Sequence, residues 1–187
     1  MPYSLIERCN AALISLGARS VTSLTEESKE ARLCAVRAEP VRDALLRSHP
    51  WNFAARQISL PLVVGDGELV NRFQLPSDCL IVRRVDAAEP DDWRVEGRLL
   101  VAPVEPPAAV GYTARVDDPT QWDALFAECF SAKLAAELAV AVTGSRTEEA
   151  HRQSQFRLKL IDAKRSDAQE SGGASLRDGS WLEARVG

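Results

Sequence analysis

Residues 118–143 read DPTQWDALFAECFSAKLAAELAVAVT, and this stretch predicts a long helix buried among other helices. Asp118 can cap the first turn, Pro119 sits where a helix has no use for an N–H group, and Gly144 suits the position after the last turn. Apolar side chains cover two neighbouring faces of such a helix, which is typical of a helix packed on several sides. The charged residues spread along it (Asp123, Glu128, Lys133 and Glu137) argue against a membrane span. We therefore expect the centre of a helical bundle here.

Three more helices are predicted from Ser-x-x-Glu patterns, which are typical of a capping box at a helix start. The patterns begin at Ser4, Ser23 and Ser145. The first helix should end at Gly17, and the second before Pro50, with Pro40 kinking or dividing it. The last helix should reach residue 169 or so and carries only a narrow apolar stripe, which predicts an exposed helix lying on the bundle.

Residues 51–116 change character, because glycine and proline recur and short apolar runs lie between them. Gly65-Asp66-Gly67 separates two such runs and predicts a hairpin; RVEGRLLV around Gly97 predicts a second one. The predicted fold class is α+β, mainly α: a bundle of about four helices with a small antiparallel β subdomain between the second and third helices. In this division, residues 1–50 and 118–170 form the bundle and 51–117 the β subdomain of a single domain, 1–170.

Residues 171–187 are expected to form a flexible tail, because SGGASLRDGS has the composition of a polar linker. Trp181 follows the linker. It can anchor the tail on the chain's own core, lie in a disordered terminus, or dock on another chain, where Trp and Arg are common anchors.

Composition limits the function classes. The net charge of −4 and the pI near 5.3 argue against a protein whose main task is to hold nucleic acid. Only four of the 23 basic residues are lysines, which fits either interface contacts made by arginine or a GC-rich coding sequence. The isolated cysteines have no metal-site spacing, and reduced thiols in a cytoplasm fit them best. No signal peptide is expected at the N-terminus.

Motifs for catalysis are missing from the sequence, so we expect no enzyme, no cofactor and no metal. His49 precedes Pro50 at a predicted helix end, and His151 lies on a polar helix. Two pairs of neighbouring aspartates, at 91–92 and 117–118, occupy predicted turns or helix starts, where Asp is common. Carboxylates from distant positions could still meet in a glycosidase-type site.

Several stretches together resemble the tail tubular protein A family, the head-to-tail adaptors (connectors) of short-tailed phages. They are NAALISLG from residue 10, SVTSLTE from 20, RDALLRSHPWNFA from 42, LPSDCL from 75, RVEG from 94 and WDALFAECFSAKLAAELA from 122. Each stretch alone is a weak signal. Their common order and spacing across nearly the whole chain carry the resemblance.

The resemblance implies a structural virion protein with a helical bundle and an inserted β subdomain. It implies a dodecameric ring in the neck of the virion, assembled in the host cytoplasm, with the portal protein above and the tail tube or nozzle below. DNA would pass through the ring without specific binding and without a membrane being involved. The isolated chain could be a monomer, and no catalytic residues come with the resemblance.

Two groups of residues are candidate contacts. Trp181, Leu182 and Arg185 are predicted to dock on the portal, with Gly172 and Gly173 giving the tail its reach. The arginines Arg83, Arg84 and Arg94 are predicted to contact the neighbouring subunit or the next tail component. Two alternatives stay open: a virion-associated cell-wall hydrolase using a Glu/Asp pair, and a small DNA-binding packaging factor using its arginines.

Overall fold

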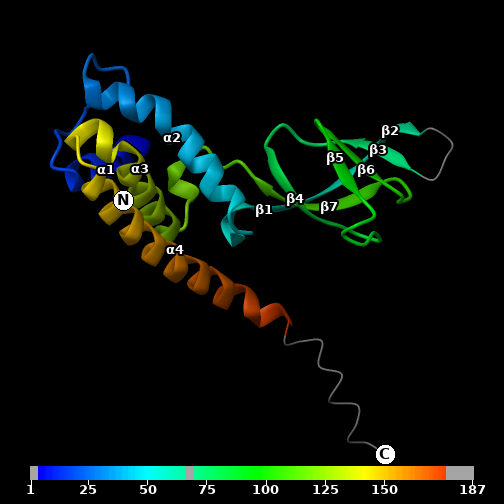
Figure 1. The fold of residues 1–187 in the computed structure, drawn as a ribbon. Helices are drawn as coiled ribbons and strands as arrows, with labels where there is room; N and C mark the ends of the chain where they lie inside the picture. The colour runs from blue at the N-terminus through cyan, green and yellow to red at the C-terminus, as the bar shows by residue number, and fades with distance from the viewer. Residues whose placement is uncertain (1–3, 66–69, 176–187) are drawn as a thin grey trace, which may run out of the picture. The chain divides into compact units, whose positions relative to one another are not determined.

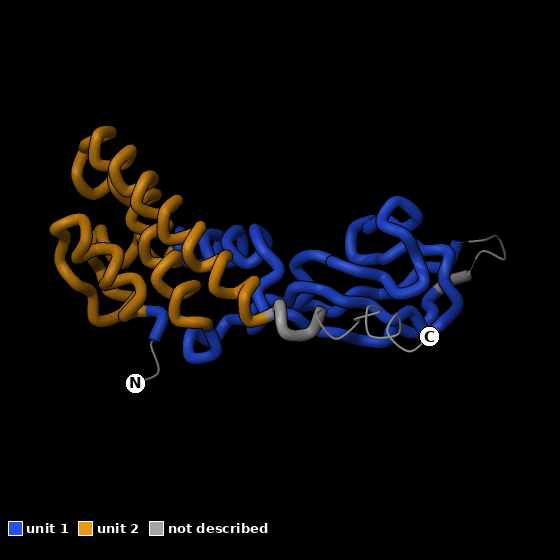
Figure 2. Tube along the Cα trace, turned by 90° about the horizontal axis from the view of Figure 1, so that it is seen from below, with its two compact units in different colours: residues 1–5, 36–122 blue, residues 6–35, 123–187 orange. Residues whose placement is uncertain are grey.

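The structure is a computed structural model that describes residues 4–65 and 70–175. In this part of the chain, two helices precede seven strands, and two further helices follow them (Figure 1). The chain forms two compact units (Figure 2). Unit 1 comprises residues 1–5 and 36–122, and unit 2 comprises residues 6–35 and 123–187. The helix α2 contributes its first part to unit 2 and its second part to unit 1.

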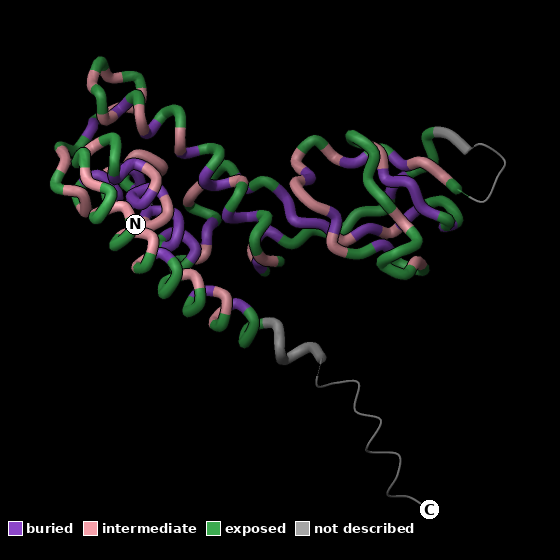
Figure 3. The backbone as a smooth tube through the Cα atoms, in the orientation of Figure 1, coloured by how far each residue is buried: buried purple, intermediate pink, exposed green. Residues whose placement is uncertain are grey.

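Unit 2 is helical, with α3 at its centre. Its helices are α1 (Leu5–Ser15), the first part of α2 (Lys29–Arg47), α3 (Ala124–Thr143) and α4 (Arg146–Ser175). Figure 3 shows α3 largely buried, whereas the exposed colour recurs along the coloured part of α4. Phe126, Phe130 and Leu134 of α3 are completely buried. Ser131 Oγ also donates a hydrogen bond to the carbonyl of Arg8 (3.1 Å), which ties α3 to α1. The predicted burial of this helix is confirmed.

The start of α3 differs from the prediction, while its end agrees with it. Asp118 accepts a hydrogen bond from the Thr120 amide and begins only a short 3-10 helix, Pro119–Gln121. Asp123 is the cap of α3, because its carboxylate accepts from the amides of Leu125 and Phe126. At the other end Gly144 adopts a left-handed conformation (φ 71°), as expected for a residue that ends a helix.

The other helix starts show which capping boxes form. Ser145 Oγ accepts from the Glu148 amide and starts α4 as predicted. The pattern at Ser23 does not start α2, because the Glu26 carboxylate instead accepts from the amide and hydroxyl of Thr22. The helix begins at Lys29, after Ser28, and Pro40 lies within it without ending it.

Unit 1 contains two antiparallel sheets. The first has the order β1 (Ala55–Leu60), β7 (Ala108–Ala114), β4 (Cys79–Val85). The second has the order β2 (Leu62–Gly65), β3 (Asn71–Gln74), β6 (Leu99–Ala102), β5 (Arg94–Glu96). A short 3-10 helix, Asn52–Ala54, leads from α2 into β1. Both sheets contribute to one apolar core, which includes Phe73 and Leu100 from the second sheet and Val85 and Val110 from the first.

Local turn signals predict the hairpins of this unit correctly. Strands β2 and β3 pair on either side of Gly65-Asp66-Gly67, and β5 pairs with β6 across Gly97, whose φ of 60° suits glycine. Pro61 separates β1 from β2, and these two strands belong to different sheets.

The predicted fold class is wrong. Half of the chain is helical, and seven strands of its described part form two antiparallel sheets, so the fold is a mixed α+β fold and not a mainly α bundle with one small sheet. The error has a physical cause: β7 pairs with both β1 and β4, and these long-range pairings decide how the short strands divide into sheets. Neither partner can be identified from the local pattern of apolar residues.

An arginine-lined cavity as the candidate functional site

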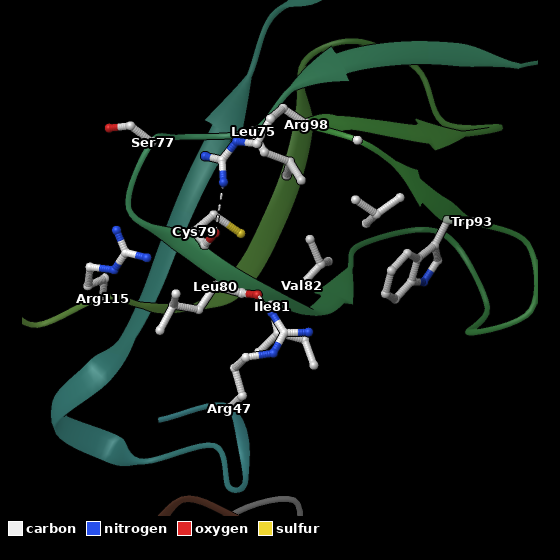
Figure 4. A pocket seen from close by; sticks show the side chains of 12 residues that line it. Arg47, Leu75, Ser77, Cys79, Leu80, Ile81, Val82, Trp93, Arg98 and Arg115 are labelled. Carbon is white, nitrogen blue, oxygen red and sulfur yellow. Dashed lines mark hydrogen bonds between the residues drawn. The ribbon is translucent and has the colours of Figure 1, made fainter. Parts of the chain in front are cut away.

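A cavity of about 620 Å³ opens in unit 1 at the edges of both sheets (Figure 4). One part of its lining comes from β4, the last strand of the first sheet, and another from Trp93 and Val95 at β5, the last strand of the second. Three arginines from separate segments complete it: Arg47 at the end of α2, Arg98 in the turn before β6, and Arg115 after β7.

Arg47 and Arg98 hydrogen-bond to backbone carbonyls at the start of β4. Arg47 donates to the carbonyl of Leu80, and Arg98 donates to those of Cys79 (3.1 Å) and Pro76. Within residues 4–65 and 70–175, neither arginine has a carboxylate partner. No ion pair with a described residue therefore neutralises the positive charges of Arg47 and Arg98 at this cavity.

Arg115 differs from these two, because it has a carboxylate partner. Its guanidinium donates to both oxygens of Asp43, with N···O distances of 2.6 and 3.3 Å. This hydrogen bonding with Asp43 raises the pKa of Arg115. Asp43 also accepts from the buried side chain of Arg42 (2.9 Å), which pairs in turn with Asp117 (2.7 Å). The network fastens the second part of α2 to the segment that leaves β7.

Arg83, a predicted interface residue, has a local structural role. Its Nε donates to Thr113 Oγ1 (2.9 Å), and its terminal nitrogen donates to the carbonyls of Arg47 and His49 (both 3.0 Å). Partial burial, and then the nearby charge of Arg47, lower the pKa of Arg83. Arg83 thus ties β4 to the end of α2.

Arg84 and Arg94, the other two predicted interface residues, are exposed and make local ion pairs. Arg84 on β4 pairs with Asp86 (2.8 Å), and Arg94 on β5 pairs with Glu96 (2.7 Å). The structure places the three predicted arginines on two sheets and does not gather them into one cluster. Their contact with another subunit or tail component stays a prediction.

The predicted portal-docking residues Trp181, Leu182 and Arg185 lie outside the described residues. Gly172 and Gly173, expected in a flexible linker, are within α4, which continues to Ser175. Docking by the tail, and the division of the chain into residues 1–170 and 171–187, stay predictions.

Sequence reasoning missed the residues that form the cavity. Arg47, Trp93 and Arg98 belong to different segments, and only the pairing of strands brings them to one place. The one local signal was the predicted turn at Gly97, which fixes the backbone next to Arg98. The turn at Gly97 does not reveal that β4 lies on the other side of the cavity.

No protein-family model and no curated protein matches the chain.

None of the helices in the described part of the chain combines the length and apolarity needed to cross a membrane. Across residues 4–65 and 70–175, no three His, Cys, Asp or Glu side chains are grouped so that they could hold a metal ion. The cavity itself offers guanidinium donors beside apolar walls, which is an arrangement suited to binding.

Proposed function

We propose that this chain is a structural virion protein, a head-to-tail adaptor that forms a ring between the portal and the tail of a short-tailed phage. The observation that carries the proposal is the ordered series of sequence stretches from residue 10 to residue 139 that resembles the tail tubular protein A family. The adaptor acts by binding the portal protein on one side and the tail tube or nozzle on the other. The ring leaves a channel through which DNA passes.

The positions of these stretches agree with an architectural role. The stretch that begins at Arg42 forms the end of α2 and the turn into β1. Trp51 in this stretch is completely buried, and its Nε1 donates to the carbonyl of Leu45 (3.0 Å). Arg42 and Asp43 belong to the ion-pair network described above. These residues support the framework of unit 1, as expected for a protein that acts by assembly.

The surface of α4 also supports assembly. Leu158 and Ile161 are 64% and 54% exposed, and residues three apart lie on the same side of a helix. A ring needs two different faces on each subunit, because each copy meets its neighbour head-to-tail. An exposed apolar stripe on a long helix suits one such face.

The test is a mass measurement by light scattering on the purified chain, first alone and then with the portal protein of the same phage. The adaptor proposal expects a chain that joins the portal ring in a copy number equal to that of the portal subunits. A chain that ignores the portal under these conditions contradicts the proposal. In that case, a turbidity assay on peptidoglycan tests the hydrolase alternative, since an adaptor clears no cell wall.

A further inference from the structure

We propose that the arginine-lined cavity of unit 1 binds an extended acidic peptide segment, with one bulky apolar side chain, supplied by a partner protein. The site is separate from the tail residues that the adaptor proposal assigns to the portal. The inference does not depend on the adaptor function, because it rests on the charge, the lining and the strand edges of this cavity.

The charge of the cavity calls for an anionic partner. Arg47 and Arg98 make hydrogen bonds only to carbonyl groups within the described residues, so both positive charges are available to a ligand. A guanidinium has five N–H donors, and these bonds use a minority of them. Arginine also matches the geometry of a carboxylate, which it can bind through two parallel hydrogen bonds.

Like charges meet beside this cavity. Arg47 lies near enough to Arg83 for its charge to contribute to the lowered pKa of Arg83. Arg83 has no carboxylate partner in the described part of the chain, since its hydrogen bonds go to Thr113 and to the carbonyls of Arg47 and His49. A carboxylate bound at Arg47 relieves this repulsion, so the protein gains from an acidic ligand and not from a neutral one.

The walls of the cavity fit an apolar side chain. Trp93 is half-buried, Val95 is 44% exposed, and Leu80 and Ile81 of β4 are half-buried along the lining. Figure 4 shows Trp93 and the side chains of β4 around the same space. Volumes of this size are typical of sites that enclose small ligands or anchoring side chains. A Leu or Phe of the peptide would cover Trp93 and Val95, which water now contacts.

The backbone of β5 explains why the segment should be extended. Among the described residues, strand β5 pairs with β6 alone, so its other edge presents backbone N–H and C=O groups that an extended peptide can bind as an added strand. The carbonyls at the start of β4 already accept hydrogen bonds from Arg47 and Arg98. The added segment would therefore pair with β5 and place its acidic side chains near the two arginines.

A nucleic acid is the competing ligand, because arginines beside an aromatic ring can also bind phosphate and a stacked base. The observations favour a peptide for two reasons. The lining contains a run of aliphatic side chains in β4, and an open strand edge offers backbone pairing that a nucleic acid cannot use. The chain also carries a net charge of −4, which opposes binding of a long polyanion.

The probe is a short fluorescein-labelled peptide with Phe and Leu between Asp and Glu residues, titrated with the full chain and followed by fluorescence anisotropy. The matched control peptide has Lys at the acidic positions. We expect the acidic peptide to bind and the basic one not to bind, and binding should weaken as salt is raised. R47Q and R98Q should each weaken binding about fivefold, because each removes one guanidinium.

R84Q serves as the matched control, because Arg84 is exposed on β4, lies outside the cavity lining and pairs with Asp86. It should change the affinity by less than about twofold. R47K and R98K, which keep the charge, should recover part of the affinity if each variant is folded. A further measurement needs no variant: the amide resonances of Arg94–Glu96 in the wild-type chain should shift during titration with the acidic peptide.

Three results would overturn the proposal. The first is that the acidic peptide does not bind with a dissociation constant of about 1 mM or lower. The second is that binding survives R47Q and R98Q unchanged, with no shift in β5. The third is that an oligothymidylate or inorganic phosphate displaces the peptide and itself binds more tightly, which would assign the site to phosphate. Failure to join a portal would leave all of these readouts unaffected, so the two proposals fail separately.

Discussion

At the scale of single residues, Asp43 joins α2 to the segment that follows β7. It accepts hydrogen bonds from Arg42 and Arg115, and Arg42 is only 5% exposed. D43A would leave the buried Arg42 with Asp117 alone, a residue whose side chain is 73% exposed. We expect the free energy of unfolding to fall by about 2 kcal/mol, measured by urea denaturation.

D86A is the matched control for D43A, since Asp86 pairs with the exposed Arg84 at the surface of the same unit. Exposed ion pairs contribute little, so this variant should lose less than about 0.5 kcal/mol. Equal losses in the two variants would show that the network at Arg42 has no special role in stability.

Cys129 provides a prediction at alkaline pH. It is completely buried in α3, and burial raises the pKa of its thiol from an ordinary value of 9.0 to about 11. The fold therefore favours the neutral thiol, and the resulting stabilisation is complete below about pH 9 and is lost as the pH rises towards about 11. We expect the unfolding free energy of the wild type to fall more steeply in this range than that of C129A.

The slopes should differ by up to about 1.4 kcal/mol per pH unit, because the wild-type unfolded state releases one proton that C129A lacks. The comparison uses the slope of the unfolding free energy against pH and not its absolute value, because the lost sulfur lowers the stability of C129A at every pH. Urea denaturation at several pH values gives both curves. If the unfolding free energies of the wild type and C129A fall in parallel with pH, the pKa of Cys129 is not raised by burial.

At the scale of elements, the start of α3 separates the sequence prediction from the structure. Asp123 accepts from two amides at the first turn of α3, whereas Asp118 caps a 3-10 helix of three residues. D123A should therefore lower the free energy of unfolding by about 1 kcal/mol, and D118A by only a few tenths. Thermal unfolding of the two variants, followed by circular dichroism, makes the comparison. A larger loss of stability in D118A than in D123A would show that Asp118 caps the first turn of the long helix, as the sequence pattern predicts.

Elements set by local chemistry could be predicted from the sequence. Gly144 ends α3, Ser145 caps α4, and Gly97 makes the turn between β5 and β6, since each acts on a backbone a few residues away. The helix start predicted at Ser23 is wrong, because the Glu26 carboxylate accepts a hydrogen bond from the Thr22 amide, which is an equally local alternative to the capping box. Ser-x-x-Glu alone does not distinguish the two outcomes.

The division of the strands into two sheets and the cavity depend on long-range strand pairing, which local sequence patterns do not show. The run QISLPLVV before the turn at Gly65 suggests one strand, and nothing in it shows that the strands on the two sides of Pro61 join different sheets. The candidate site has the same origin. Arg83, Arg84 and Arg94 are candidates because they lie in the predicted β subdomain. The cavity that Arg47 and Arg98 line forms only when β4 pairs with β7 and β5 pairs with β6.

At the scale of the whole molecule, the acidic balance separates an adaptor from a DNA-binding factor. With a net charge of −4, the chain should release few counterions from DNA, so we expect no binding tighter than about 10⁻⁴ M near physiological salt. Anisotropy of a labelled duplex at several salt concentrations checks this. Tighter binding that weakens steeply with salt would favour the packaging-factor alternative.

The last prediction concerns the tail that follows α4. The buried side chains of α4 that the structure describes, Phe156, Ala163 and Asp167, all precede Ser175. A chain that lacks residues 176–187 keeps all of these buried side chains, so we expect little change in its melting temperature, and it lacks Trp181, Leu182 and Arg185. If these residues dock on the portal, the truncated chain should lose at least about tenfold in affinity for it, because buried Trp and Arg anchors dominate such contacts.

W181A and S180A in the full chain form a matched pair for this test, since they change neighbouring positions and only one removes an anchor. W181A should lose most of the affinity that truncation removes, and S180A almost none. A truncated chain that melts normally and still joins the portal with full affinity would remove the tail from the interface. The contact would then have to lie within residues 1–175, where the exposed stripe of Leu158 and Ile161 on α4 offers the next surface to mutate.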